Sequence, residues 1–202
     1  MPKNSYVQIP RRRRDGKTDY RKRKGLIVGR KPMFAIRVSN KFVYGQILEA
    51  TPKGDLTLCS ASSRELREAY GWKGSCKNLP AAYLAGYLLG CKALTKQISE
   101  AILYTGVNRF VHGSRIASAI KGAKDAGLEL AVAEEALPKD ERMRGGHVAA
   151  YAKTLAETDN KDYSKIFSGT IASGFNPREY SSHFEKIKTA ISPADTKSAA
   201  KS

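Results

Sequence analysis

Residues 101–132 read AILYTGVNRFVHGSRIASAIKGAKDAGLELAV, which is the pattern of a strand, a helix and a second strand. Apolar residues predict a strand over Ala101–Val107, and apolar residues alternate again over Leu128–Val132. Between them we expect a helix over Ser114–Ala126, because serine is a good N-cap, apolar residues recur at helical spacing, and Gly127 can end the helix. A strand–helix–strand unit of about thirty residues favours two parallel strands joined by a right-handed crossover.

Three further strands are expected before this unit. Alternating apolar residues predict strands over Met33–Val38, Phe42–Ala50 and Leu56–Ala61, separated by turn sequences at Ser39–Lys41 and Thr51–Asp55. Such closely spaced strands favour an antiparallel meander with one covered face. Joined to the strand–helix–strand unit, the meander predicts an α/β fold with a mixed β-sheet and helices packed on it.

The longest helix is expected over Pro80–Ile98, with Asn78 and a proline at its start. Gly86 and Gly90 lie on one stripe of this helix, and we expect them to allow close helix–sheet packing rather than a ligand contact. Trp72 is expected to be a core or edge anchor rather than a base-stacking platform. Shorter helices are expected over residues 17–29 and Ser63–Tyr70.

The C-terminal part has a different pattern. A helix is expected over Val148–Ala156, and Asn176-Pro177 should begin another whose apolar stripe must bury against the body or a partner. That stripe consists of Tyr180, Phe184, Ile187 and Ile191. Upstream, a small apolar set is formed by Tyr163, Phe167 and Ile171. We therefore divide the chain into a basic arm (1–30), an α/β body (31–156) and a helical extension (157–202) whose tail from Ser192 is expected to be frayed.

Positive charge is concentrated at the N-terminus. Residues 1–41 hold fourteen lysines and arginines against two aspartates, and so carry +12 of the formal +17. Arg11–Arg14 are consecutive, and like charges with few apolar neighbours cannot form a core. We expect residues 1–16 to be extended when bound to a partner and disordered when free. The natural partner is a polyanion, most commonly nucleic acid, although a charge run alone also suits an anionic membrane surface.

Other residue types support RNA. Arginine binds phosphate in bidentate fashion, and tyrosines interleaved with the charge can stack on unpaired bases. These tyrosines are Tyr6, Tyr20 and Tyr44, each of which also suits ordinary packing. The uncovered face of the meander is expected to show Arg37, Lys41, Tyr44 and Gln46. The loop Arg142–His147 contains Gly145-Gly146 before a helix, and phosphate contact and an ordinary turn are equally good interpretations of it.

The sequence offers little for catalysis. It contains no G-x-x-x-x-G-K-[ST], G-x-G-x-x-G or H-E-x-x-H motif, and its three histidines lack metal-ligand spacing. Glu49 and Asp55 are the carboxylates nearest the ends of the second and third strands, and we expect them to be turn charges. Neither an enzyme activity nor a cofactor nor a metal is expected. No apolar run suits a membrane span, and three widely spaced cysteines favour free thiols in a reducing cytosol.

An ordered series of motifs resembles one family. Arg11–Arg14 followed by Thr18–Arg23 is similar to the opening of the L-eighteen family of large-subunit ribosomal proteins, whose eukaryotic counterpart is L-five. The resemblance continues, in order, through Ser39–Lys41, Tyr70–Trp72, Asn78–Leu84 with Gly86, Gly106–Asn108, Gly113–Arg115, Gly122–Leu128 and Arg142–His147. It covers about residues 5–155 and is of the archaeal and eukaryotic type. The family often has Gly-Ala-His where this chain has Gly145-Gly146-His147.

The resemblance implies a ribonuclease-H-like translational-protein fold without catalysis. It also implies binding of 5S rRNA in the central protuberance, contact with the large rRNA and with the other 5S-binding ribosomal protein, and residence in the cytoplasm on the large ribosomal subunit, with no membrane partner. Together with Tyr44 from the sheet face, the RNA-binding residues expected are Arg11, Arg12, Arg13, Arg14, Lys17, Tyr20, Arg21, Lys22, Arg23, Lys24, Arg37, Asn40, Lys41, Arg144 and His147. The alternative interpretation is a ribonuclease-H-like nucleic-acid enzyme.

Overall fold

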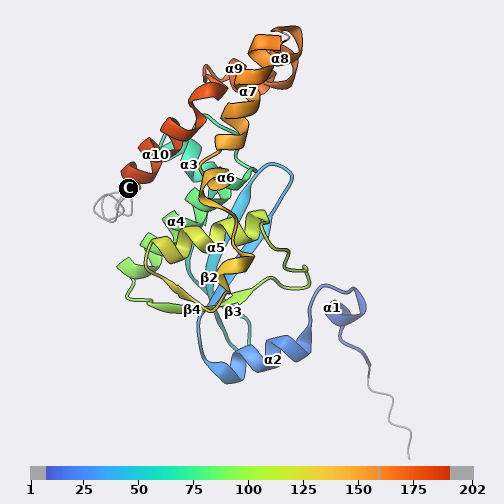
Figure 1. Ribbon diagram of the computed structural model, residues 1–202. Coiled ribbons are helices and arrows are strands. Elements are labelled where there is room, and N and C mark those ends of the chain that lie inside the picture. Colours follow the sequence, from blue (N-terminus) through green and yellow to red (C-terminus); the bar gives the residue numbers. More distant parts are fainter. Residues whose placement is uncertain (1–7, 159, 192–202) are drawn as a thin grey trace, which may run out of the picture.

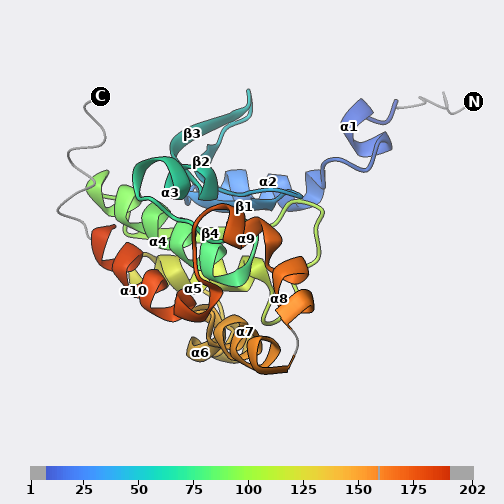
Figure 2. The same cartoon turned by 90° about the horizontal axis from the view of Figure 1, so that it is seen from above.

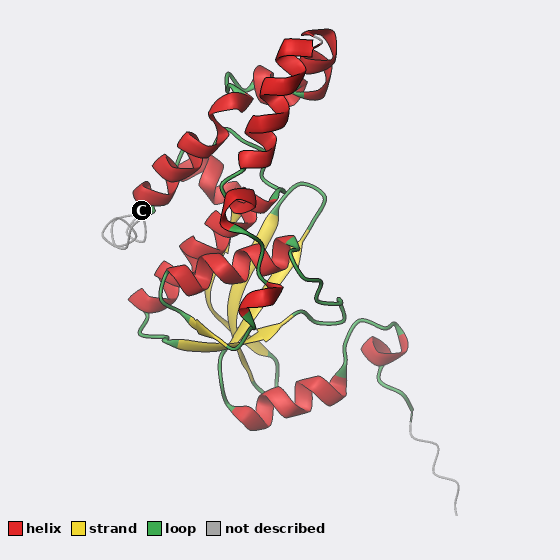
Figure 3. Ribbon diagram, viewed as in Figure 1, coloured by secondary structure: helices red, strands yellow, loops and turns green. Residues whose placement is uncertain are grey.

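The computed structural model describes residues 8–158 and 160–191. Within these residues one sheet of five strands, in the order β3-β2-β1-β4-β5, lies at the centre of the molecule (Figure 1; Figure 3). The strands are β1 (Met33–Val38), β2 (Val43–Ala50), β3 (Asp55–Ser62), β4 (Glu100–Tyr104) and β5 (Glu129–Leu130). The chain is therefore α/β with a mixed sheet, as predicted.

Strand pairing confirms both predicted units. β1, β2 and β3 form an antiparallel meander, and β4 is parallel to β1 on one side and to β5 on the other. The predicted ends of the last two strands are wrong. β4 stops at Tyr104 because Gly106, at φ 65°, turns the chain away. β5 has only two residues, because the Val132 N–H turns back to donate to the Leu130 carbonyl at 2.9 Å.

Helices make up most of the remaining described residues. They are α1 (Arg11–Arg14), α2 (Tyr20–Gly29), α3 (Ser63–Ala69), α4 (Leu79–Thr95), α5 (Arg115–Asp125), α6 (Asp140–Met143), α7 (Gly146–Thr158), α8 (Asn160–Ile166), α9 (Ser168–Ala172) and α10 (Tyr180–Ala190), with 3₁₀ turns at Glu134–Ala136 and Pro177–Glu179. Side-chain N-caps begin several of them: Ser62 caps α3, Asn78 caps α4 and Ser114 caps α5.

α4 ends three residues before the predicted Ile98. Gln97 adopts a left-handed φ of 61°, and the N–H groups of Gln97 and Ile98 donate to the carbonyls of Leu94 and Ala93 at 2.9 and 3.0 Å. These two bonds form a Schellman motif, which satisfies the last carbonyls of a helix. The motif usually has glycine at the left-handed position, so the glutamine gave no sequence signal for the helix end.

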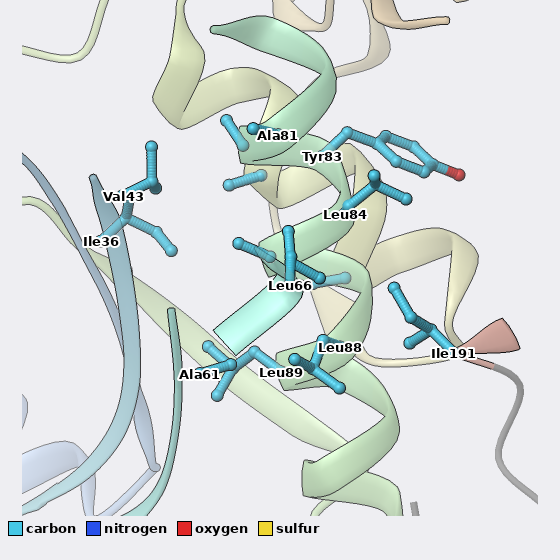
Figure 4. Packing of buried hydrophobic residues seen from close by; sticks show 14 of the residues in the cluster. Ile36, Val43, Ala61, Leu66, Ala81, Tyr83, Leu84, Leu88, Leu89 and Ile191 are labelled. Carbon is cyan, nitrogen blue, oxygen red and sulfur yellow. The ribbon is translucent and has the colours of Figure 1, made fainter. Parts of the chain in front are cut away.

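α4 is the centre of the main core. Its buried Leu84, Leu88 and Leu89 lie between the sheet on one side and Ile191, just after α10, on the other (Figure 4). Ile36 of β1 faces it from the sheet. Because α4 contacts the sheet, α3, α5 and α10, its apolar sequence organises the whole body.

α4 and α5 cross at very short range. A Cβ on Gly86 would fall against the Ala119 carbonyl oxygen, one on Gly90 would lie 2.7 Å from the Ala126 Cβ, and one on Gly122 would meet the Tyr83 carbonyl oxygen. The prediction that Gly86 and Gly90 serve packing is thus confirmed. However, the element that approaches them is a helix and not the sheet.

Replacing Gly86 with alanine should therefore destabilise the fold. The added methyl group would meet backbone atoms, which cannot move aside as a side chain can, so we expect a loss of about 3 kcal/mol in the free energy of unfolding. Urea denaturation followed by circular dichroism measures this. Gly25→Ala in α2 is the matched control, because nothing lies within 4 Å of its added Cβ. It should leave stability unchanged or raise it by up to about 1 kcal/mol, and an equal loss in both variants would contradict the crossing argument.

The second face of the sheet is also partly covered, which the prediction of one covered face missed. Met33, Ala35 and Leu48 are buried there, and Leu26 of α2 packs against them. α2 follows the basic run and has only a weakly apolar side, so its sequence did not show that it would cover a sheet. It covers the beginning of β1 and leaves the rest of that face open.

The apolar stripe of α10 docks on the body as predicted. Tyr180, Phe184, Ile187 and Ile191 are all buried. Trp72 is 1% exposed and meets Tyr180 edge-on at 5.5 Å between ring centroids, so its predicted role as a core anchor is confirmed. Burial raises the pKa of Tyr180 to about 12.

The smaller apolar set of the extension is only partly buried. Phe167 is buried, and Tyr163 lies beside it with ring centroids 5.4 Å apart. Ile171, the third residue of the set, is 42% exposed. It lies in the five-residue helix α9, which is too short to continue the stripe of α8. The predicted frayed tail from Ser192 lies outside the described residues.

All three cysteines are buried and unpaired, and burial raises the pKa of each thiol. Across residues 8–158 and 160–191, no helix combines the length and apolar character needed to cross a bilayer.

Candidate nucleic-acid interface

The basic run does not lie extended in its described part. Residues 11–14 form the single helical turn α1, in which the N–H groups of Arg13 and Arg14 donate to the Pro10 carbonyl at 2.9 and 3.0 Å. Gly16, at φ 64°, ends the turn. The expectation of disorder in the free chain is therefore wrong for these four arginines, because a proline carbonyl and a permissive glycine close the turn locally, and the extended conformation in a complex stays a prediction. Tyr6 lies outside the described residues.

α1 stands apart from the body, and all four of its arginines are exposed (Figure 1; Figure 2). Three weak contacts hold the turn and the segment that follows. Asp15 lies 4.0 Å from Arg11 and 3.5 Å from Lys17, and Arg12 donates from Nε to the Thr18 hydroxyl at 2.8 Å. Exposed ion pairs of this kind contribute little to stability, so the cationic turn is available to a larger anion.

α2 begins where Asp19 caps it. The Asp19 carboxylate accepts from the N–H groups of Arg21 and Lys22 at 3.0 and 3.1 Å, which satisfies two otherwise unpaired helix donors. This local bond starts the helix within a sequence whose charges alone oppose order. As a result, the next four basic residues are held on a helix that Leu26 fixes against the sheet.

Arg23 fastens α2 to the sheet. Its guanidinium binds Asp55 in bidentate geometry, with N–O distances of 2.7 and 2.9 Å, and also donates to the Thr51 carbonyl at 3.3 Å. The hydrogen bond to Asp55 raises the pKa of Arg23 above its usual value. Asp55 was expected to be a simple turn charge, whereas it is the anchor of the basic helix. Among the residues predicted to bind RNA, Arg23 is therefore one whose positive charge is already neutralised by a bidentate carboxylate.

A basic cleft of about 630 Å³ lies between the arm, the sheet and two loops, on the side of the sheet that faces α2. The basic side chains that line it are Arg12, Lys17, Arg23, Arg37 and Lys53. Tyr20, Tyr104 and Asn108 add aromatic and amide groups. We call this space the basic cleft.

The structure brings five of the sequence-predicted residues together at the basic cleft, namely Arg12, Lys17, Tyr20, Arg23 and Arg37. The other basic residues of the arm that were predicted to bind RNA are also exposed, namely Arg11, Arg13, Arg14, Arg21, Lys22 and Lys24. Asn40 and Lys41 are exposed in the β1–β2 turn, and Tyr44 is exposed on β2. All of these keep their RNA-binding role as predictions.

Arg144 and His147 lie elsewhere. Arg144 lines a separate hollow with Tyr83, Lys121 and other groups of α4, α5 and α10, and lies 3.3 Å from Glu185. His147 is exposed, and desolvation together with the nearby Arg142 lowers its pKa. Any RNA contact by these two residues would involve a second surface, on the side of the sheet covered by α4 and α5.

The Gly145-Gly146 loop has a packing reason for its glycines. Gly145 has φ 80°, and a Cβ there would lie 3.2 Å or less from atoms of the Tyr180 ring. A Cβ on Gly146 would lie 2.9 Å from the Glu141 Cγ. These contacts favour the interpretation as an ordinary, tightly packed turn, and phosphate contact at this loop remains a prediction.

Sequence reasoning missed several groups of the basic cleft. Lys53 was seen only as part of a turn, and Tyr104 only as part of a strand. Asn108 was noticed only through the family resemblance. Strand register could have placed Tyr104 at the cleft. Tyr104 pairs with Ala35, so the end of β4 lies beside the half of β1 that carries Arg37.

This arrangement can bind a polyanion. Several exposed guanidinium and ammonium groups surround one space, and arginine can contact phosphate through two N–H groups at once. Within the described part of the chain, no three His, Cys, Asp or Glu side chains converge on a point where a metal ion would fit.

Comparison with known proteins gives a consistent result. A family model described as "Ribosomal large subunit proteins 60S L5, and 50S L18" matches residues 5–100. The large ribosomal subunit protein uL18 of Thermofilum pendens is 44% identical over 195 residues, covering 96% of this chain and 99% of the relative. The uL18 proteins of Aeropyrum pernix and Caldivirga maquilingensis are 46% and 44% identical, and cover 96% and 95% of this chain and 91% and 92% of their own lengths.

Proposed function

Because the chain belongs to the uL18 family of large ribosomal subunit proteins, and to its archaeal type, we propose that it binds 5S rRNA and anchors it in the central protuberance. The arm and the basic cleft are the main contact. The observation that carries this assignment is the gathering of Arg12, Lys17 and Arg37 around one space. These three residues belong to the first 41 residues, which carry +12 of the formal +17.

The mechanism follows from this geometry. The exposed arginines of α1 and α2 contact phosphates, which dominate affinity without reading sequence. α2 itself is preorganised by Asp19 and by the Arg23–Asp55 pair, so less order has to be gained on binding. We also propose that the fold is of the ribonuclease-H-like translational type. In the cytoplasmic ribosome the protein further contacts the large rRNA and the other 5S-binding protein.

The enzyme alternative is weaker. A two-metal nuclease needs free carboxylates near the strand ends. Two of the carboxylates at those positions are paired inside the chain: Asp55 with Arg23 at 2.7 Å, and Glu100 with Lys31 at 2.6 Å. The proposed role is therefore structural and not catalytic.

Purification from the source under RNase-free conditions tests the proposal. We expect an RNA of 5S size to co-purify, and the purified protein to prefer 5S rRNA to a control RNA of equal length in a gel-shift assay. Equal affinity for both RNAs would contradict it. Magnesium-dependent degradation of the RNA would instead support the nuclease alternative.

A further inference from the structure

α2 leaves half of one sheet face bare. It covers the Met33–Leu48 pair through Leu26, and the strand register then places two further rows of side chains beyond it. One row is Ala35–Gln46–Ser60, in which Ala35 still belongs to the buried cluster with Met33 and Leu48, and the next is Arg37–Tyr44–Ser62. Side chains at these paired positions point to the same side of the sheet, so they form one continuous surface next to the basic cleft.

This surface is hollowed and polar. A depression of about 420 Å³ is lined by residues of both rows, including Arg37, Tyr44, Gln46, Ser60 and Ser62. The carboxylate that lines it, Glu65, is paired with Lys92. Among the described residues Arg37 has no carboxylate partner, and it lines the basic cleft as well. The depression and the cleft are thus joined through one unpaired guanidinium.

Tyr44 is the aromatic group of this surface. Its side chain is 41% exposed, and the Phe42 ring meets it edge-on with centroids 6.3 Å apart and planes at 65°. An edge contact of this kind steadies the ring and covers at most one of its two faces. Gly45, the next residue, faces the core, because an added Cβ there would lie 2.8 Å from Leu89 Cδ2. Since successive side chains of a strand point to opposite faces, Tyr44 points away from the core.

We infer that an unpaired nucleobase of the bound RNA stacks on Tyr44, with its edge toward the amide and hydroxyl groups of Gln46, Ser60 and Ser62. This deepens the proposed function and rests on it, because it names the class of RNA element that this side of the interface takes. Bases inside a double helix are stacked on one another and cannot lie on a side chain, whereas bases of loops and bulges can. Arg37 holds the phosphate that leads from the base into the basic cleft.

Substitution of Tyr44 tests the inference. Tyr44→Leu removes the ring but keeps an apolar side chain at an exposed position, so the body should stay folded, which circular dichroism checks. One stacked base corresponds to a loss of about five- to 150-fold in affinity for 5S rRNA. Tyr44→Phe keeps the ring and should bind within about twofold of the unchanged chain. Tyr151→Leu is the matched control, because Tyr151 is 50% exposed but lies on α7, away from the basic cleft.

The salt dependence separates stacking from charge. Tyr44→Leu should lower affinity at every salt concentration and leave the slope of log K against log salt unchanged, whereas Arg37→Gln should reduce the slope by about one phosphate contact. The inference is overturned if Tyr44→Leu binds 5S rRNA as tightly as the unchanged chain. It is also overturned if Tyr44→Phe loses as much affinity as Tyr44→Leu.

A second pair of probes keeps this result distinct from the proposed function. A short unstructured RNA should lose affinity in Tyr44→Leu, and a duplex of the same sequence should not. If the chain fails to prefer 5S rRNA but this difference holds, the stacking site stands and the 5S assignment falls. If 5S rRNA is preferred but Tyr44→Leu loses affinity for neither short RNA, the 5S assignment stands and the stacking site falls.

Discussion

Affinity for 5S rRNA should fall by roughly a thousandfold or more when monovalent salt is raised from about 50 to about 200 mM. Each phosphate that a lysine or arginine neutralises releases condensed counterions, and about six such contacts are enough for a change of this size. The described arm supplies Arg11–Arg14 and α2 in exposed positions, and the basic cleft adds Lys17, Arg37 and Lys53. Filter-binding titrations at four or five salt concentrations measure the slope.

The structure sharpens this expectation. Arg23 already shares its charge with Asp55, so its replacement should change the slope less than replacement of Arg12, which has only a hydroxyl partner. Arg12→Gln and Arg23→Gln have the same change in formal charge and form a matched pair. A flat salt response in the unchanged chain would refute the electrostatic mechanism altogether, and equal slopes in the two variants would refute the special role of Arg23.

Local sequence patterns were enough to predict most of the fold. The alternation in β1 to β3, the helix starts at Asn78 and Ser114, and the stripe of α10 each depend on residues close together in the chain. The errors occurred where distant residues decide. Gln97 ends α4 in a left-handed conformation that a glycine would usually mark in the sequence. Leu26 covers part of the second sheet face, but it lies in a highly charged helix whose sequence shows no clear apolar stripe.

The site could be predicted only in part for the same reason. The charge of the arm is plain in the sequence, but the meeting of Arg12, Lys53 and Asn108 depends on how the arm, the β2–β3 turn and the loop after β4 fold together. Asp55 shows the limit best. Its carboxylate looked like a turn charge, and only the folded chain shows that it orients Arg23 and with it the basic helix.

Deleting residues 1–25 should lower affinity for 5S rRNA at least about tenfold, since it removes most of the arm's phosphate contacts, while the body stays folded. The main core begins at Phe34, so the deletion removes none of its buried residues. It does remove Arg23, which leaves the partly exposed Asp55 without its partner. Circular dichroism and a gel shift on the same preparation measure the fold and the affinity together.

A shorter deletion separates charge from the loss of α2. Removing residues 1–18 keeps the Asp19 cap and the Arg23–Asp55 pair, but takes away six lysines and arginines, five of them within Arg11–Lys17. We expect this variant to lose at least about tenfold in affinity as well, with a salt slope smaller by the number of contacts removed. Deleting residues 192–202, which hold two lysines and one aspartate, is the control and should change neither quantity. If the shorter deletion binds as tightly as the full chain while the longer one does not, the contact lies in α2 and the cationic turn α1 has no part in it.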